Sequence, residues 1–579
     1  AKRRHSTSLP CHILTSWPLH FQVASRLSTP APHLLYNSAQ FEFPAKHPML
    51  TYVPPEQRPA PPTYERPWLL LLLAFVWLWP GVFAHDLWQD EISVYAVIRQ
   101  AAEGGQWWLP QDGGTLFWDV PPLYMWLSLL FLKLFGHLPP YEAVRMVNAL
   151  LAAVSLAAMG GAGRMLLGRR NGRTAVLVLI GCPGLLMMSH FIGGQIVTLC
   201  GLSLSFYALA MARQKTVKAI VLTLLGWTVL SLSGSLLPLL GVILTTALLL
   251  LDSHWHNKRF WLTLLAAAGL TLPLLFVWPL VLNGLSHEAF LQWWRYHALA
   301  PFGGFARLDF GFSAAYYLKN LLWFAFPAWP LALWTLYRQR RLPRHGWNSL
   351  CLIWLAVFGL VLIISPQHME DNLMLLLPPL VLAAAAQADQ LRRGAAAFFN
   401  WFGIMTFGSL ALFVWLGFFA MNFGWPAKLA ERAAYFSPYY QRDIDYFPVI
   451  VAVLFTPVWL LAITRKYVRG RQAVTNWAAG LTLCWSLILT LFLPWLDAAK
   501  SYRPVVQRLE AELPADACVS AQHPVVRHAW QEYSRYPLGE NCHFVATLRH
   551  ESVPDATELT SANRPREKHE AFVLWQRQE

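Results

Sequence analysis

Apolar residues occur in this chain as long blocks with short polar segments between them. A block of roughly 17 to 25 apolar residues forms a helix long enough to cross about 30 Å of hydrocarbon. Such blocks recur from Trp68 to Trp495 and predict an all-α polytopic membrane protein with about thirteen transmembrane helices. The predicted spans lie near residues 67–84, 142–167, 174–192, 195–212, 217–233, 235–251, 259–281, 313–336, 347–365, 372–389, 395–418, 446–464 and 476–495.

The basic residues indicate the orientation of these spans, because Lys and Arg resist translocation and collect in cytoplasmic loops. They occupy alternate loops, which predicts a cytoplasmic N-terminus. The loops opposite are predicted to be external, and the first of them, residues 85–140, is rich in acidic residues. The cytoplasmic set is Arg169, Arg170 and Arg173; Arg213 and Lys215; Lys258 and Arg259; Arg338, Arg340 and Arg341; Arg392 and Arg393; Arg465, Lys466, Arg469 and Arg471.

The two ends of the chain differ from the apolar region 67–496. An odd number of spans places residues 497–579 outside, where mixed charge and Pro-Gly turns predict a small periplasmic α/β domain. Cys518 and Cys542 share that oxidising side, where they can form a disulfide or stay as two thiols. Residues 1–66 are expected to be a disordered or non-native segment followed by a cytoplasmic lead, with Met49 as the natural start.

One apolar run, Pro121 to Gly136, is left out of the spans because it is short, opens with Pro-Pro and contains Lys133. A crossing here would also break the charge alternation. We predict an interfacial helix, whose Tyr124 and Trp126 suit the headgroup layer. The first external loop is then a membrane-lying module of two or three short helices.

Composition excludes several classes of protein. With 56% hydrophobic and 13% charged residues, the chain does not suit a water-soluble surface. The formal charge of +14 comes from short loops, which favours topology signals and contacts with anionic lipids over a nucleic-acid site. The seven cysteines form no C-x-x-C pair and no histidines have ligand spacing, so the sequence predicts no metal site and no required cofactor, although a divalent cation stays open.

Two adjacent carboxylates, Asp90 and Glu91, follow the first span at the start of an amphipathic helix. One interpretation is helix capping, since Asp90 can accept from free N–H groups of the first turn and Glu91 complements the helix dipole. The other is a general base, since a carboxylate near apolar surface can activate an acceptor hydroxyl. Asp119 favours the second interpretation, because it ends the same loop beside the rigid Pro121-Pro122 pair.

Several segments of residues 67–395 together resemble a known family. They are Asp90 to Arg99, Trp108 to Pro110, Phe117 to Trp126, Arg145, Trp293 to His297, Tyr316-Tyr317 and Leu375 to Leu380. In order and spacing they resemble the polyprenol-phosphate-sugar-dependent membrane glycosyltransferases of the GT-C superfamily. The resemblance is strongest to the bacterial aminoarabinose transferase of lipid A and more distant to the protein O-mannosyltransferases.

The resemblance implies a glycosyltransferase in the bacterial inner membrane. Such an enzyme takes a sugar from undecaprenyl phosphate on the periplasmic face, without a nucleotide, and transfers it with inversion to lipid A, another glycan or a protein. It implies that Asp90 acts as base or orients the acceptor, with Glu91 and Asp119 beside it. The residues expected to hold the donor phosphate are Arg295, His297, Arg307, Lys319 and Tyr124. For Arg295, contact with lipid headgroups is an equal alternative.

Three departures from the family pattern support a different hypothesis. Val120 stands where relatives have a lysine, Gln195 lies near the position of a second acid, and Ala300 near that of an arginine. A non-catalytic member that binds envelope glycan enzymes would explain them. A transporter or flippase of lipid-linked glycans is the third hypothesis, although the sequence has no clear internal repeat and few acids inside spans.

Overall fold

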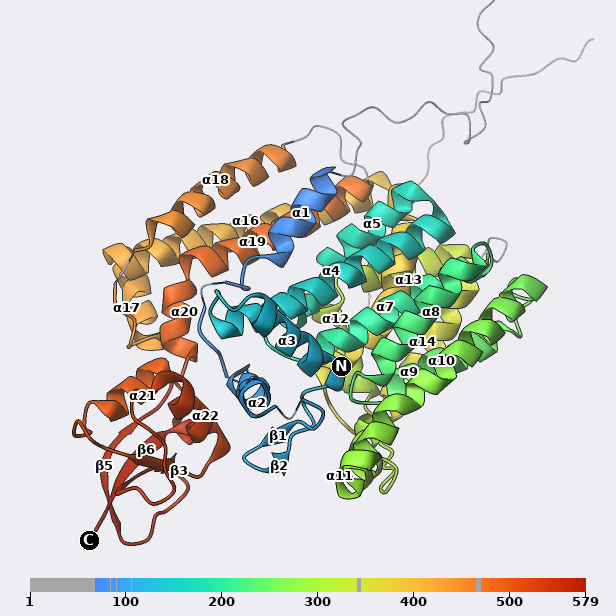
Figure 1. Ribbon diagram of the computed structural model, residues 1–579. Helices are drawn as coiled ribbons and strands as arrows, with labels where there is room; N and C mark the ends of the chain where they lie inside the picture. The colour runs from blue at the N-terminus through green and yellow to red at the C-terminus, as the bar shows by residue number, and fades with distance from the viewer. Residues whose placement is uncertain are drawn as a thin grey trace, which may run out of the picture. The chain divides into compact units, whose positions relative to one another are not determined.

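The computed structural model describes residues 68–83, 85–89, 91–105, 107–340, 345–442, 444–464 and 470–578 (Figure 1). The N-terminal segment 1–66 and Asp90 lie outside these residues. Each of the thirteen predicted spans contains helix, so the prediction of a helical membrane-type fold is confirmed.

Seven helices in the described part of the chain are long and apolar enough to cross a membrane. They are α4 (Pro140–Leu167), α7 (Gln195–Ala212), α10 (Lys258–Leu285), α14 (Gly346–Ile364), α16 (Arg393–Phe423), α18 (Tyr446–Ile463) and α19 (Gly470–Leu491). The pair α5 (Arg169–Ile180) and α6 (Gly184–His190), bent by 81°, makes an eighth candidate. Shorter apolar helices are α1 (Trp68–Leu78), α3 (Pro122–Leu134), α8 (Thr216–Ser231) and α9 (Leu237–Leu249). The total of thirteen spans stays a prediction.

Besides residues 174–192, which contain the bent α5–α6 pair, two other predicted spans are broken rather than continuous. Residues 313–336 form α12 (Ala314–Phe324) and α13 (Ala328–Gln339), with Pro327 at the break. Residues 372–389 begin as a 3₁₀ segment, η5 (Glu370–Leu376), and continue as α15 (Leu377–Ala386), whose first turn holds Pro378 and Pro379. Proline lacks the N–H that the previous turn needs and favours the first turn of a new helix, which explains both breaks.

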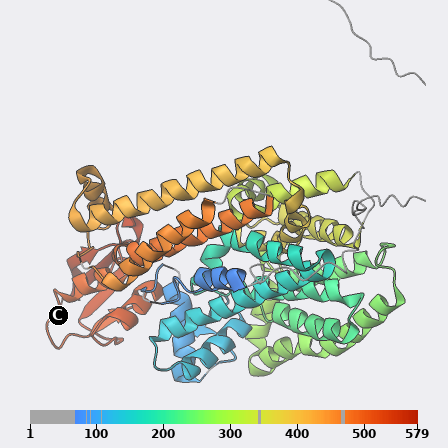
Figure 2. The same ribbon diagram turned by 90° about the horizontal axis from the view of Figure 1, so that it is seen from above.

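Small residues let the central helices approach closely. A Cβ atom on Gly172 of α5 would lie 2.6 Å from the Gly160 carbonyl oxygen of α4, so no side chain fits there. Such contacts replace the hydrophobic driving force that is missing between helices in lipid. The long helices α16 and α19 also run side by side, as Figure 2 shows, and join the C-terminal part to the bundle.

The first predicted external loop contains two helices, α2 (Glu91–Gly104) and α3, as predicted. Between them lies a hairpin that the sequence analysis did not predict, formed by β1 (Gln111–Asp112) and β2 (Thr115–Leu116). Gly113 and Gly114 form its turn with φ values of 55° and 88°, a conformation that favours glycine. The membrane-lying position of α3 stays a prediction.

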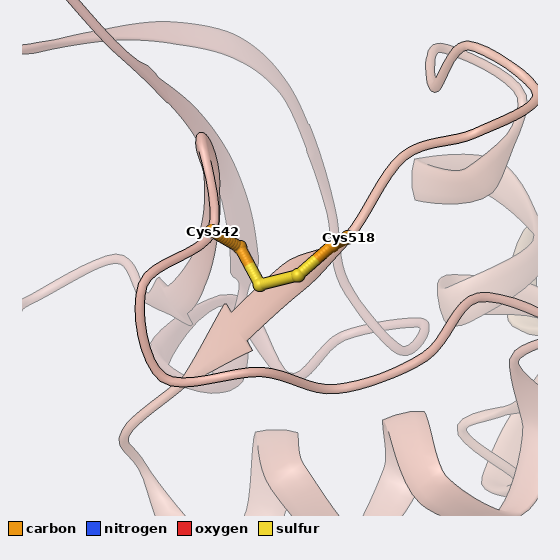
Figure 3. The surroundings of a disulfide bond; sticks show 2 residues. All are labelled: Cys518 and Cys542. Carbon is orange, nitrogen blue, oxygen red and sulfur yellow. A yellow bond between two sulfur atoms is a disulfide. The ribbon is translucent and has the colours of Figure 1, made fainter.

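The C-terminal part forms a small α/β unit, as predicted. Helices α20 (Leu493–Lys500) and α21 (Arg503–Glu510) lead to a four-stranded sheet of order β3-β4-β6-β5. The strands are β3 (Val519–Ala521), β4 (Phe544–Leu548), β5 (Ala556–Ala562) and β6 (Phe572–Arg577), and helix α22 (Pro524–Tyr533) lies between β3 and β4 in the sequence. Strands β3 and β4 are parallel, and the other pairs are antiparallel. Cys518 and Cys542 form a disulfide (Figure 3), which decides between the two alternatives left open by the sequence.

Candidate active site

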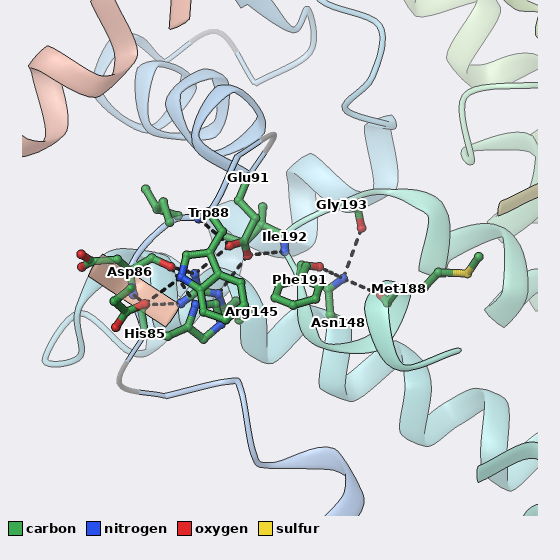
Figure 4. A network of polar contacts seen from close by, with 12 residues as sticks. His85, Asp86, Trp88, Glu91, Arg145, Asn148, Met188, Phe191, Ile192 and Gly193 are labelled. Carbon is green, nitrogen blue, oxygen red and sulfur yellow. Dashed lines mark hydrogen bonds and ion pairs between the residues drawn. The ribbon is translucent and has the colours of Figure 1, made fainter. Parts of the chain in front are cut away.

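A buried ion pair fixes the start of α2 against α4. The Arg145 side chain is fully buried, and it donates from Nε to Glu91 Oε1 at 3.1 Å and from Nη2 to Oε2 at 3.2 Å. The Glu91 carboxylate also accepts from the backbone N–H of Trp88 at 2.9 Å and of Ile192 at 2.8 Å (Figure 4). These four donors use the four lone-pair sites of a carboxylate. Glu91 therefore holds this part of the loop in place, and its catalytic role stays a prediction.

The same arginine holds the chain that precedes α2. Its Nη1 donates to the His85 carbonyl and its Nη2 to the Asp86 carbonyl, each at 2.8 Å. Burial, with the nearby Arg145 charge, lowers the pKa of His85 to about 3, so the imidazole is neutral at physiological pH. Arg145 thus binds residues on both sides of a short segment that ends at Glu91.

A second buried polar residue, Asn148, lies one turn after Arg145 on α4. Its Nδ2 donates to the Phe191 carbonyl at 2.7 Å and, at longer distances, to the carbonyls of Met188 and Gly193. Its Oδ1 accepts from the Tyr124 hydroxyl at 2.6 Å. Tyr124, predicted to contact the donor phosphate, is fully buried and occupied by this contact. Figure 4 shows Arg145 and Asn148 joining the first loop to the turn before α7.

Pro121, two residues after Asp119, packs close to two glycines. A Cβ on Gly194 would lie 2.1 Å from Pro121 Cδ, so the turn before α7 packs directly on the proline ring. Gly234, with φ of +93°, is also near this proline, since a Cβ there would lie 3.8 Å from Pro121 Cγ. α3 begins directly after this packed proline. Asp119, two residues before Pro121, is exposed.

The structure brings Asp119 to His297, which lies 178 positions later in the sequence. The His297 ring stacks on Trp118 with ring centres 5.3 Å apart. Partial burial lowers the pKa of His297, while the negative charge of Asp119 acts in the opposite direction. The two side chains therefore interact electrostatically. A neutral imidazole next to an exposed carboxylate can donate or accept a proton or hydrogen bond from a bound substrate.

Two of the three predicted cations are also close to each other. Arg295 belongs to the π-helix η3 (Trp293–His297), and its carbonyl accepts from the Ala306 N–H at 3.0 Å, which places Arg307 next to it in the turn. Both side chains are exposed, and no acidic residue in the described ranges forms an ion pair with either. Lys319 is exposed on α12, and no contact among the described residues joins it to this group. The described residues contain no cluster of three or more metal-ligating side chains.

The comparisons with known proteins agree with the resemblance found in the sequence. Residues 119–279 match the family model of dolichyl-phosphate-mannose-protein mannosyltransferases. The crystal structure of apo ArnT from Cupriavidus metallidurans superposes with a TM-score of 0.60, covering 88% of this chain and 97% of ArnT at 16% identity. This chain has the ArnT fold. ArnT bound to undecaprenyl phosphate gives a TM-score of 0.57 at 15% identity, covering 88% and 98% of the two chains. Among curated proteins, none matches this chain in sequence.

The ArnT fold and the apolar helices make this chain a multi-pass membrane protein. The predicted resemblance to polyprenol-phosphate-dependent glycosyltransferases is confirmed. Of the three departures from the family pattern, Val120 is 1% exposed and packs in the core, whereas Gln195 is exposed. A side chain at position 120 therefore points away from the solvent-facing side that Asp119 occupies.

The C-terminal unit also contacts the first loop through several hydrogen bonds. Arg503 makes a two-bond contact with Asp86, from Nε at 2.8 Å and from Nη2 at 2.7 Å. Asp497 accepts from Trp88 Nε1 at 2.7 Å and from the Asp86 N–H at 3.2 Å. The loop is therefore held on one side by Arg145 and on the other by these residues from the end of the chain.

Sequence reasoning did not commit to Asn148 or Arg145 as site residues. A signal was present, because an arginine and an asparagine three residues apart in an apolar helix are costly in lipid unless they have partners. Their spacing puts them on one face of α4, and that face is where the loop and the turn meet.

Proposed function

We propose that this protein is a glycosyltransferase that moves a sugar from a polyprenyl phosphate to an envelope acceptor. The observation that carries the proposal is the end-to-end likeness to ArnT, which has been crystallised with undecaprenyl phosphate. The mannosyltransferase family match over residues 119–279 supports the same reaction class. The acceptor is lipid A, another glycan or a protein, each of which reaches the outer face of the inner membrane.

We place the site on the periplasmic side of the bacterial inner membrane. The alternating basic loops support a cytoplasmic N-terminus and an external C-terminal domain. The Cys518–Cys542 disulfide supports the same side, because disulfides persist in the periplasm and are rare in the cytosol. Among the described residues, the free cysteines Cys182, Cys200, Cys351 and Cys484 are all buried.

The reaction is a direct displacement at the anomeric carbon. An acceptor oxygen loses its proton to a carboxylate and forms the new bond, while the bond from the anomeric carbon to the phosphate oxygen breaks. The lipid phosphate leaves with the electron pair, and the configuration inverts. Cations that stabilise the leaving phosphate lower the barrier by several kcal/mol in a water-poor site.

Each residue has a role that its surroundings suit. We propose that Asp90 removes the proton from the acceptor oxygen. Asp119 and His297 orient the sugar or the acceptor. Arg295 and Arg307 are exposed and free of acidic partners in the described ranges, so they suit a phosphate. Glu91 and Tyr124 act as positioning residues, because all their polar contacts are made within the protein.

A non-catalytic family member is the second candidate. The observation in its favour is Val120, a buried apolar residue where relatives have a phosphate-binding lysine. Such a protein would bind the lipid donor without transfer. No observation on the described residues favours a transporter in the same way.

The test compares envelope glycolipids and glycoproteins by mass spectrometry in cells with the wild-type chain, a deletion, Asp90→Asn or Asp516→Asn, at equal membrane levels. Asp516 is exposed in the C-terminal unit and serves as the matched control. Loss of one sugar-sized mass in the deletion and in Asp90→Asn, but not in the control, supports the proposal. No change in any variant supports the non-catalytic candidate.

A further inference from the structure

A polar cleft of about 350 Å³ lies between the first external loop and the C-terminal unit, and its lining does not include Asp119, His297, Arg295 or Arg307. One wall is the second half of α2, with Arg99 and Gln100, and the other is α22, with Arg527 and Gln531. Gln100 also borders a neighbouring hollow of about 170 Å³ that reaches Gln111 of the hairpin. Figure 1 shows α2 and the hairpin next to α22. The two hollows together form a groove along α2.

Specific contacts between the hairpin and α22 hold the two walls of the groove together. Asp112 of the hairpin forms an ion pair with Arg527 and accepts from His528 Nε2 at 2.8 Å. Although burial acts in the opposite direction, the hydrogen bond from His528 and the Arg527 charge lower the pKa of Asp112. A Cβ on Gly113 would lie 3.0 Å from Arg527 Nη1, so the guanidinium rests on bare backbone. These contacts lock the hairpin to α22.

The charges of the groove are balanced within the protein. Arg99 donates to Glu103 at 2.9 Å and to Glu532 at 2.8 Å, and Arg527 pairs with Asp112. A phosphate in this groove would meet about as many carboxylates as guanidinium groups, so its binding would gain little. The electrostatics therefore disfavour an anionic ligand such as a lipid phosphate.

The polar side chains of the groove that have no protein partner in the described part of the chain are glutamine amides. Gln100 and Gln531 are exposed on opposite walls, and neither side chain bonds to another residue in the part of the chain that the structure describes. Each amide offers one acceptor oxygen and two donor hydrogens, which match the paired hydroxyls of a sugar ring. A groove with free amides and balanced charges suits an uncharged, hydroxyl-rich ligand.

We propose that this groove binds a neutral glycan portion of the acceptor. The inference rests on the proposed function, since it assigns the acceptor's distal part to a second site on the loop that carries the acids. Gln100 lies nine residues after Glu91, about 14 Å along α2 at the helical rise. An acceptor of several sugar units reaches both places, so its chain length and its uncharged hydroxyls determine specificity.

The experiment measures binding by saturation-transfer NMR on the full chain in detergent. The probes are the neutral and the acidic oligosaccharide pools released from the envelope of cells that carry this protein, separated by anion exchange. The variants are Gln100→Ala/Gln531→Ala and the matched control Gln441→Ala/Gln522→Ala, whose residues are exposed but lie outside the groove. Equal thermal unfolding of both variants shows that folding is intact.

We expect the neutral pool to bind the wild type, the control and Asp90→Asn. The groove variant should bind it about tenfold or more weakly, because the hydrogen bonds from both amide side chains are lost. Binding of the acidic pool alone, binding of neither pool, or equal neutral binding by the groove variant would overturn the inference.

The same variants separate this inference from the proposed function. If the protein transfers sugar and the groove variant raises the acceptor KM with little change in kcat, both hold. If neutral glycan binds but no Asp90-dependent transfer occurs, the groove stands and the transferase proposal fails. If transfer occurs with an unchanged acceptor KM in the groove variant, the transferase stands and the groove inference fails.

Discussion

The buried pair of Glu91 and Arg145 predicts a large loss of stability when only one partner is removed. In Glu91→Gln the amide keeps the size of the carboxylate but puts an NH₂ group where donors already point, and it leaves the Arg145 charge unpaired. Breaking one side of a buried ion pair costs about 3–5 kcal/mol. Arg145 is 0% exposed, so water cannot replace the lost carboxylate.

The assay measures thermal unfolding of the purified chain in detergent by circular dichroism. Sugar-transfer activity is measured separately on the folded variants. The matched control is Glu558→Gln, because Glu558 pairs with Arg549 at 3.5 Å where both side chains are about half exposed. That pair should contribute less than about 1 kcal/mol. Glu91→Gln should therefore unfold at a clearly lower temperature than the control.

A double replacement separates stability from positioning. Glu91→Leu/Arg145→Met removes both charges, and replacing a buried pair by apolar groups is often neutral or stabilising. The double variant should recover only part of the lost stability and none of the transfer activity, because the N–H groups of Trp88 and Ile192 and the carbonyls of His85 and Asp86 lose their partners. If Glu91→Gln unfolds at the same temperature as the wild type, this reasoning is refuted. Full transfer activity of the double variant would refute the positioning role.

Three further predictions concern other parts of the molecule. Burial and a neighbouring carboxylate raise the pKa of Asp497 to about 7, so between the unfolded value near 4 and pH 7 only the folded state holds the proton. Stability should therefore fall by up to about 1.4 kcal/mol per unit as pH rises from 5 to 7 and then level off, and thermal unfolding of Asp497→Asn should lack this slope. Reduction of Cys518–Cys542, which closes a loop of 24 positions, should destabilise the C-terminal unit by about 3 kcal/mol; unchanged proteolysis of that unit under reductant would contradict this. Arg295→Ala and Arg307→Ala should each weaken binding of undecaprenyl phosphate, measured by native mass spectrometry, whereas the headgroup interpretation of Arg295 predicts equal weakening for any anionic lipid.

Local sequence was sufficient for the helices. Apolar blocks of membrane length determined where they lie, because each backbone group in lipid must bond within its own helix. The exceptions are local as well: Pro183, Pro327 and the Pro378-Pro379 pair lie at the breaks of three predicted spans. Their positions were readable from the sequence, but the analysis gave the apolar length more weight than the prolines.

The C-terminal α/β unit and the two helices of the first loop also followed from composition and turn residues. The hairpin between those helices was missed, because its strands have two residues each and carry no alternating pattern. The two glycines of its turn were the available signal. The choice between a disulfide and two thiols needed the fold, since spacing alone does not bring Cys518 to Cys542.

The site depended on tertiary structure. Glu91 meets Arg145 across 54 positions, Asp119 senses His297 across 178, and Asp86 contacts Asp497 across 411. The sequence determined which residue types are available and which lie inside apolar helices, where a polar side chain needs a partner. Only the packed structure decided the partners, because helix periodicity fixes the face of one helix and contains no information about which distant segment covers that face.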